Sequence, residues 1–260
     1  MLRSLWSAAT GMNAQQMQID VTANNLANSS TTGFKKSRAS FEDLMYMTQR
    51  IAGQTTPGGG QVPTGIQVGM GVNTAGISKI FTQGDYVETG NELDFAIEGA
   101  GFFRVLHNDE DLYTRAGNFT LDSEGFITSQ AGDRLQPEIA IDIEAVTITL
   151  DEDGTLTVFG DNEEILATEN VLVTTFINPA GLQAVGGNLF RVTEGSGDAN
   201  EGTPGEDGAG TTVNRFIESS NVDVIEEMVG LISGQRTYEA NSKSITTADA
   251  MLSTAVNLKN

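Results

Sequence analysis

Apolar residues recur at intervals of three and four at both ends of the chain, with few charges and no proline to interrupt them. Such spacing is typical of helices that pack lengthwise on other helices in a coiled-coil-like manner. We therefore predict a helix at each end and expect the two helices to pair. The predicted packing positions are Leu2, Leu5, Met12, Ile19 and Leu26 near the start, and Val224, Met228, Leu231, Tyr238, Ile245, Leu252 and Val256 near the end.

The two predicted helices are short of apolar surface for a core of their own. Small or polar residues such as Gln16, Gln235, Ser242 and Asp249 occupy several of the packing positions. Burying the few large apolar side chains offsets only part of the conformational entropy that is lost when helices of this length become ordered. We therefore expect the helices to order fully only where neighbouring copies of the chain pack around them, which makes self-assembly the first hypothesis.

The middle of the chain has the pattern of antiparallel strands. Short alternating runs separated by Gly, Asn and Asp fill residues 72–216. Residues 119–127 and 148–156 share a Leu-Asp-x-x-Gly motif between two β-like runs, with Gly125 and Gly154 where a hairpin turn closes. The predicted fold class is α+β: paired terminal helices form an axial core domain, and a central antiparallel β-rich domain lies between them in sequence.

Turn-forming residues divide the chain further. Gly33 follows a run of Asn, Ser and Thr and is placed to end the first helix. Residues 53–71 are too rich in Gly and Pro for a helix or an interior strand. Asp223 is the predicted N-cap of the last helix. The expected parts are an N-terminal axial helix at 1–33, an extended arm or connector at 34–71, the β-rich domain at 72–216, and a C-terminal axial helix at 217–260 that packs with 1–33.

Composition excludes several classes of function. The net charge of −21 and the sequence pI near 4.1 repel phosphate backbones and argue against nucleic-acid binding. No apolar run is long enough to span a bilayer, so we expect no membrane-spanning segment. The absence of Cys removes disulfides, thiolate chemistry and Cys-based metal sites. The first residues carry one cation and no sustained apolar core, so we interpret them as a mature helix and expect no cleaved signal peptide.

Candidate catalytic chemistry is sparse. His107 is the sole histidine, and we interpret it as a solvated loop residue. The acidic groups 109–111 and 151–153 do not continue with the alternating oxygen ligands of a calcium loop and are interpreted as turns. We expect no catalytic, cofactor or metal site. A paired-carboxylate glycosidase stays open at this point, because the distances between the many acidic residues cannot be read from sequence.

Four blocks of sequence resemble one known family. Near the start they are Asn24, Asn25, Leu26, Ala27 and Asn28, followed by Gly33 and Phe34; near the end they are Gln235, Arg236, Tyr238 and Asn241. Between them, residues 93–103 and 113–119 are similar to shared blocks of a β domain. In this order the blocks resemble the bacterial flagellar rod, hook and hook-associated axial proteins, over essentially the whole chain.

Within that family the length and the arm at 46–67 are most similar to the distal rod branch. A proximal rod or short hook-type subunit is the nearest alternative. An alternative of a different class is a secreted β-rich glycan-binding or glycan-cleaving protein.

The resemblance implies a structural subunit that polymerises into a rigid helical tube, transmits torque from the motor to the hook, and encloses an export channel. The implied partners are further copies of the chain, proximal rod proteins, hook protein, the peptidoglycan-ring and outer-membrane-ring proteins, the export apparatus and a rod cap. The implied location is the part of the basal body that spans the periplasm. No cofactor is implied.

Overall fold

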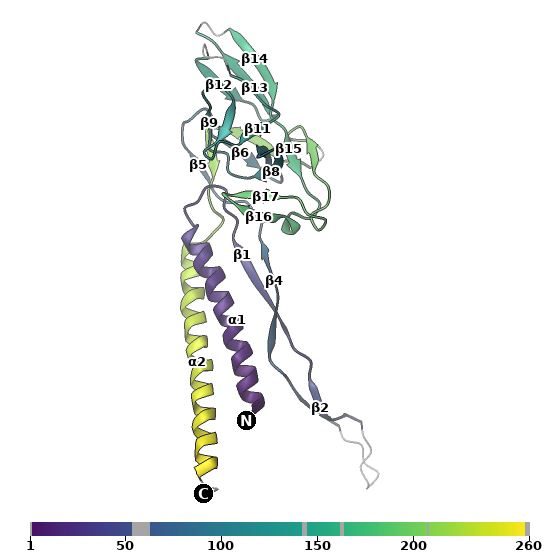
Figure 1. The fold of residues 1–260 in the computed structure, drawn as a ribbon. Helices are drawn as coiled ribbons and strands as arrows, with labels where there is room; N and C mark the ends of the chain where they lie inside the picture. The colour runs from purple at the N-terminus through teal and green to yellow at the C-terminus, as the bar shows by residue number, and fades with distance from the viewer. Residues whose placement is uncertain (1, 54–62, 142–144, 162–163, 207, 258–260) are drawn as a thin grey trace. The chain divides into compact units, whose positions relative to one another are not determined.

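The structure, a computed structural model, describes residues 2–53, 63–141, 145–161, 164–206 and 208–257 (Figure 1). The chain forms two compact units, each built from segments that are far apart in sequence. Unit 1 combines residues 1–26, 37–78 and 224–260, and unit 2 combines residues 27–36 and 79–223.

Unit 1 contains the two helices that the apolar spacing predicts. They are α1 (Leu2–Ala27) and α2 (Val224–Asn257). The prediction that the first helix extends to Gly33 is wrong, because α1 ends at Ala27. The Thr31 hydroxyl donates a hydrogen bond of 3.2 Å to Oδ1 of Asn28, and the Thr31 N–H donates one of 3.2 Å to the Asn28 carbonyl. This local turn competes with continuation of the helix. Gly33 instead takes a positive φ of 67° within the turn.

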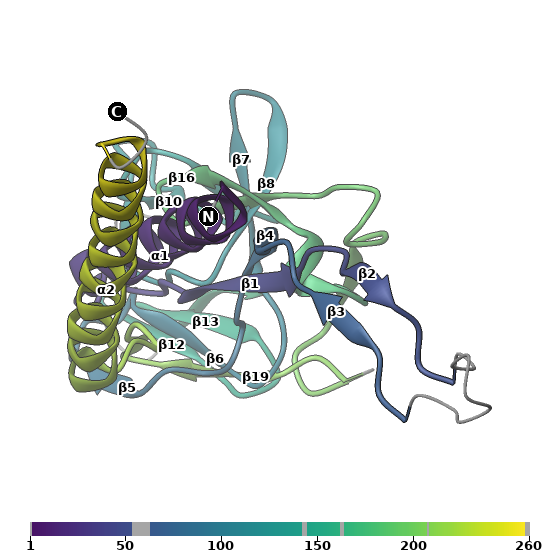
Figure 2. The same cartoon turned by 90° about the horizontal axis from the view of Figure 1, so that it is seen from below.

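The helices of unit 1 run antiparallel and side by side (Figures 1 and 2). The order of facing residues shows the direction: moving forward along α1, Gly11 lies against Asn241, Ile19 against Gly234 and Thr22 against Gly230. Helix pairing is thus observed. These contacts place glycines at the crossing, so the predicted coiled-coil-like packing of large side chains is not established by them.

The rest of unit 1 is a β-ribbon. β1 (Ser37–Asp43) pairs with β4 (Val72–Lys79), and β2 (Met47–Arg50) pairs antiparallel with β3 (Ile66–Val68). The described part of the expected arm is therefore folded as paired strands. Residues 54–62 of that arm lie outside the described residues.

Unit 2 is built from antiparallel sheets. The largest has the order β16-β17-β8-β7-β11-β10-β9, a second has the order β12-β13-β14, and three two-stranded sheets are β15-β18, β19-β6 and β20-β5. A short 3₁₀ helix, η1 (Pro179–Gly181), precedes β16. The strands are β5 (Tyr86–Glu88), β6 (Phe95–Glu98), β7 (Phe103–His107), β8 (Glu110–Thr114), β9 (Phe119–Leu121), β10 (Ile127–Ser129), β11 (Arg134–Gln136), β12 (Thr147–Leu150), β13 (Thr155–Phe159), β14 (Ile165–Asn170), β15 (Val173–Thr175), β16 (Gln183–Gly186), β17 (Leu189–Arg191), β18 (Asn200–Gly202), β19 (Thr211–Asn214) and β20 (Phe216–Glu218).

The two predicted hairpins are confirmed. β9 pairs with β10 and β12 pairs with β13, with Leu121 opposite Ile127 and Leu150 opposite Leu156. Both turns close in the same way, because the N–H of Gly125 or Gly154 donates at 3.0 Å to the carbonyl three residues earlier, and both glycines have φ above +80°. The shared Leu-Asp-x-x-Gly motif thus encodes one turn geometry twice.

The core of unit 2 combines inward side chains of both larger sheets with residues of β6 and β15. Phe95, Phe103 and Phe119 lie at its centre and are almost completely buried, and Leu156 and Val158 of the three-stranded sheet join the same cluster. A second cluster of Phe102, Tyr113, Phe176, Leu182 and Phe190 packs largely through edge-to-face ring contacts. Both clusters of buried apolar residues in the described part of the chain therefore lie in unit 2.

Candidate functional site

The helix surfaces of unit 1 divide the predicted packing residues into two groups. Leu5, Met12, Ile19 and Leu26 of α1 and Leu231, Ile245 and Leu252 of α2 are half-buried, whereas Val224, Met228, Tyr238 and Val256 are exposed. Leu2 lies in α1, but its side chain is outside the described part of the chain. The chain by itself thus partly covers seven of the eleven described packing residues and leaves four exposed.

The predicted packing residues do not include the most buried positions of the helices, although Asn25 is a family-motif residue and Ala248 shares a three-and-four spacing with Ile245 and Leu252. Ala14, Val21, Thr22 and Asn25 of α1 and Ala248 of α2 are each less than a tenth exposed. Ala14 and Val21 are one heptad apart, so a second heptad row beside the first could have indicated them. Their small or polar side chains gave a weaker apolar signal than the Leu and Met residues next to them.

Small residues bring the helices close together. A Cβ placed on Gly234 would lie 3.1 Å from Cγ1 of Ile19, and one placed on Gly11 would lie 3.2 Å from Nδ2 of Asn241. Gly234 is itself buried, whereas Gly230, one turn earlier, is exposed and would have its nearest neighbour at 4.0 Å. The Ile19 side chain therefore packs closely on α2 at Gly234, because Gly234 has no side chain of its own.

A row of exposed apolar side chains lies near the start of α2. Ile225 is 75% exposed, Val229 61% and Ile232 48%, and Val224 and Met228 flank them. The spacing of four and three places Ile225, Val229 and Ile232 on one helix face. We call these three residues the α2 apolar row.

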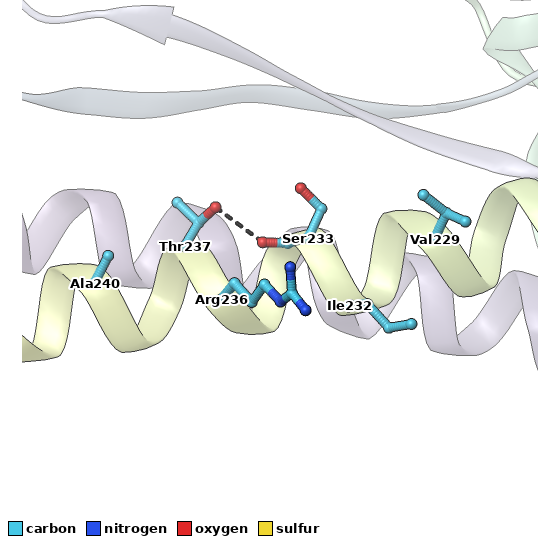
Figure 3. A pocket seen from close by; sticks show the side chains of 6 residues that line it. All are labelled: Val229, Ile232, Ser233, Arg236, Thr237 and Ala240. Atoms are coloured by element: carbon cyan, nitrogen blue, oxygen red, sulfur yellow. Dashed lines mark hydrogen bonds between the residues drawn. The ribbon is translucent and has the colours of Figure 1, made fainter.

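The α2 apolar row continues into a shallow groove (Figure 3). Its lining residues are Val229, Ile232, Ser233, Arg236, Thr237 and Ala240. The Thr237 hydroxyl donates a hydrogen bond of 2.9 Å to the Ser233 carbonyl, so this hydroxyl is already satisfied within the helix. The groove therefore offers mainly apolar surface with one guanidinium, that of the family-motif residue Arg236. Gln235 and Tyr238 of the same motif are also exposed.

The ribbon of unit 1 also exposes large apolar side chains. They are Met45, Tyr46, Met47, Ile51, Ile66 and Met70. Met45 is 87% exposed. The ring of Tyr46 lies over Gly69, where an added Cβ would be 3.5 Å from the ring. Isolated exposed apolar residues are ordinary, but six of them on one ribbon make it a candidate interaction surface.

In unit 2 a buried ion pair joins the two segments that lead to the helices in sequence. Lys35 follows α1 and Glu218 precedes α2, and both side chains are at most 1% exposed. Lys35 Nζ lies 2.5 Å from Glu218 Oε1 and donates to the Thr82 carbonyl at 2.8 Å. The Gly84 N–H donates to the same carboxylate oxygen at 2.9 Å. Arg115 Nε lies 3.6 Å from Glu218 Oε2 without a hydrogen bond.

The backbone of the same two segments is joined as well. The Gly33 N–H donates to the Glu218 carbonyl at 2.8 Å, and the Lys36 N–H donates to Oδ1 of Asn221 at 2.7 Å. A Cβ on Gly33 would lie 2.6 Å from the Ala116 nitrogen, so the motif glycine is required by close backbone packing as well as by its φ. Together with Lys35 and Glu218, these contacts form what we call the junction of unit 2.

Two further motif residues have identifiable contacts. The Phe34 ring is buried under the Lys79 ammonium, which lies 4.7 Å from the ring centroid. In unit 1, the Asn25 side chain exchanges two hydrogen bonds of 2.9 Å with the backbone N–H and carbonyl of Ser37. Asn25 thus ties the end of α1 to the beginning of β1, which explains why an amide is needed there.

Burial dominates the electrostatics of the junction. Loss of hydration lowers the pKa of the Lys35 ammonium, and the Glu218 carboxylate opposes this effect. Burial likewise lowers the pKa of Arg115. Burial, followed by the carboxylates of Glu98 and Glu218, raises the pKa of Tyr86 to about 12. Two cations therefore share one buried carboxylate.

The prediction that His107 is a loop residue is wrong, because His107 is the last residue of β7. Nδ1 of His107, at the end of β7, lies 2.6 Å from the buried Asp133 carboxylate. Across the described ranges, no group of three or more His, Asp or Glu residues is arranged to hold a metal ion. Among those same residues, no helix is both long and apolar enough to cross a membrane.

Comparison with known proteins matches three parts of the chain to family models. Residues 5–35 match "Flagella basal body rod protein", residues 96–158 match "Flagellar hook protein FlgE/F/G D1 domain", and residues 213–258 match "Flagellar basal body rod FlgEFG protein C-terminal". The chain is 45% identical to flagellar basal-body rod protein FlgG of Borreliella burgdorferi, over 100% of this chain and 99% of the relative. It is 42% identical to FlgG of Caulobacter vibrioides, over 99% of this chain and 100% of the relative.

The chain belongs to the flagellar basal-body rod protein family. It is a structural subunit of the flagellar rod, and both of these relatives, which it matches over their full length, are named flagellar basal-body rod protein FlgG. The flagellar hook protein FlgE of Helicobacter mustelae is 43% identical, but over 51% of this chain and 30% of that protein. Both partners of the buried ion pair, Lys35 and Glu218, fall inside the terminal regions matched to rod-protein models.

Proposed function

We propose that this rod protein is a distal rod subunit, which polymerises into a rigid helical tube, carries torque from the motor to the hook and encloses an export channel. The observation that carries the proposal is the α2 apolar row. Ile225, Val229 and Ile232 are exposed although they lie on a well-formed helix. Such a surface is stabilised when a neighbouring copy removes it from water.

The eleven predicted packing residues whose side chains are described take two roles in this proposal. The half-buried residues, such as Ile19 and Leu231, pack α1 on α2 within one chain. The exposed residues Val224, Met228, Tyr238 and Val256 extend the surface available to neighbouring copies. Polymerisation then covers the part of the predicted packing surface that one chain leaves in water.

The ribbon of unit 1 supplies a second contact in this proposal. Its exposed Met45, Tyr46 and Ile66 suit a lateral contact with an adjacent subunit. A tube resists bending when each subunit is held by more than one surface. The ribbon would therefore add stiffness to a tube whose helices provide the primary contact.

The junction suits a part that transmits force. Force that passes along the chain directly from either helix into unit 2 enters through the segment next to that helix. Lys35, Gly33 and Glu218 hold these segments to each other by buried ionic and backbone contacts. Buried contacts resist local opening better than exposed ones.

The proposed setting is the part of the basal body that spans the periplasm, reached through the flagellar export apparatus. The partners would be proximal rod proteins, the hook, the rod cap, the export apparatus and the rings around the rod. Exposed acids such as Asp109 and Glu152 would keep the exterior hydrated and weakly adhesive inside those rings. Unchanged motility after neutralising them would remove this bearing role.

The test replaces the α2 apolar row with serine: Ile225→Ser, Val229→Ser and Ile232→Ser in one chain. The matched control is Ile177→Ser with Val185→Ser, because these exposed apolar side chains of unit 2 lie far in sequence from the helices. Sedimentation and electron microscopy should show fibres for the wild type and the control. We expect the triple variant to remain monomeric with unchanged helix content.

Each outcome of this test has a consequence. Fibres from the triple variant at the wild-type concentration would show that the α2 apolar row is not an assembly contact. Labelling the subunit in isolated basal bodies separates the two rod positions: label in the proximal part of the rod would contradict the distal assignment. The glycan-binding alternative is not favoured, because the full-length relatives are rod proteins.

A further inference from the structure

Almost all of the net negative charge of the chain lies in unit 2. Unit 1 contains six Lys and Arg and seven Asp and Glu residues, so its net charge is −1. Unit 2 contains eight Lys and Arg and 28 Asp and Glu residues, so its net charge is −20. Unit 1, which bears the proposed assembly surfaces, is therefore nearly neutral in net charge, whereas unit 2 of the same chain is strongly anionic.

The imbalance is greatest around the three-stranded sheet of unit 2. Residues 135–190, which include β12, β13 and β14, contain ten acidic residues and no Lys or Arg. Glu152, Asp153, Glu164 and Glu169 of this region are exposed. Because these acids have no cation on their own segment, their field is neutralised mainly by ions from the medium.

We infer that unit 2 is an electrostatic brake on polymerisation, so that cations in the medium set the chain concentration at which subunits assemble. This inference rests on the proposed self-assembly and adds its regulation. Attraction between copies comes from the apolar surfaces of unit 1, a unit whose net charge is only −1. Repulsion comes from unit 2, because each added copy brings another strongly negative body close to those already in the polymer.

Screening makes the brake adjustable. Like charges on different copies repel over about 10 Å at 0.1 M salt and over only about 3 Å at 1 M salt. A high net charge keeps isolated chains soluble and monomeric. Apolar contacts in unit 1 do not depend on screening in this way, so salt shifts the balance toward the polymer. Divalent cations should act at lower concentration than monovalent ones, because they carry more charge per ion.

The experiment measures the critical concentration for fibre formation by the full chain, at several NaCl concentrations between about 0.02 and 0.3 M. A quadruple variant neutralises four exposed acids of the three-stranded sheet: Glu152→Gln, Asp153→Asn, Glu164→Gln and Glu169→Gln. The matched control changes the same four sites but keeps their charge: Glu152→Asp, Asp153→Glu, Glu164→Asp and Glu169→Asp.

For the wild type and the charge-retaining control, we expect the critical concentration to fall at least about tenfold across this range, where screening changes most. The neutralised variant should assemble at lower concentration in low salt and should depend less on salt. Equal critical concentrations at all salts and in all variants would overturn the brake while leaving self-assembly intact. Absence of fibres at every salt and concentration would overturn both proposals.

Discussion

Replacing Glu218 with Gln tests whether the junction depends on its buried charge. The substitution keeps the shape of the side chain but leaves Lys35 and Arg115 without a carboxylate in a setting where all three side chains are at most 3% exposed. Removing one partner of a buried ion pair costs about 3–5 kcal/mol, because the remaining charge is neither hydrated nor paired. We expect a loss of unfolding free energy in this range for Glu218→Gln.

The reverse substitution, Lys35→Met, should cost less. The Glu218 carboxylate keeps the Gly84 N–H at 2.9 Å and the guanidinium of Arg115, so one favourable donor and one cation remain. We expect a loss of about 1–3 kcal/mol, close to that for leaving a buried group partly unsatisfied. The double variant should lose less than the two single losses combined, by about 1–3 kcal/mol, because residues in direct contact are coupled.

The assay is urea unfolding of the full chain by circular dichroism, with hydrogen exchange to locate the loss in unit 2. The matched control is Glu110→Gln, whose carboxylate contacts Arg191 at 2.5 and 2.7 Å but is exposed. The Glu110–Arg191 pair has two hydrogen bonds, whereas Lys35 makes one to Glu218. Glu110→Gln should nevertheless cause no measurable loss of unfolding free energy, because water solvates both groups. If Glu218→Gln cost no more than Glu110→Gln, or if the double variant were additive, burial would not be the source of the effect.

Two other predictions concern the helix pair and the alkaline limit of stability. Gly230→Ala should raise the free energy of unfolding by about 0.5–1 kcal/mol, because Ala is a better helix former than Gly and this position is open. Gly234→Ala should give none of this gain, because its Cβ would lie 3.1 Å from Cγ1 of Ile19. Equal melting temperatures of the two variants would contradict the close approach of the helices at Gly234. Because the pKa of Tyr86 is raised to about 12 in the folded chain, its contribution to stability is complete below about pH 10 and is lost as the pH rises toward 12. Urea midpoints at pH 9 and 11 should therefore differ more for the wild type than for Tyr86→Phe, and an equal drop would show that Tyr86 does not titrate in this way.

Local patterns in the sequence were sufficient for the elements that depend on near neighbours. The three-and-four spacing predicted α1 and α2, because a helix presents residues at that interval on one face. The repeated Leu-Asp-x-x-Gly motif predicted the β9-β10 and β12-β13 hairpins, because a turn closes within a few residues and needs a positive φ at a fixed position. The lack of Cys and the high negative charge needed only counting.

The end of α1 shows where local reasoning was insufficient. Gly33 has the backbone conformation expected of a residue that ends a helix, yet α1 stops at Ala27. The turn around Asn28 and Thr31 ends the helix first, and Gly33 is needed for its contact with the backbone of Ala116, which lies far away in sequence. A single sequence does not indicate which of two suitable residues ends the helix.

Tertiary structure alone decided which surfaces are covered and which charges meet. Lys35 reads as one cation in a short basic group, and its burial against Glu218 follows from contacts between residues 183 positions apart. The periodicity of α2 placed apolar residues on more than one face, and only the position of α1 left Ile225, Val229 and Ile232 in water. Periodicity reports that a face is apolar, whereas burial depends on what the rest of the chain brings to it, and here the chain brings too little to cover both faces.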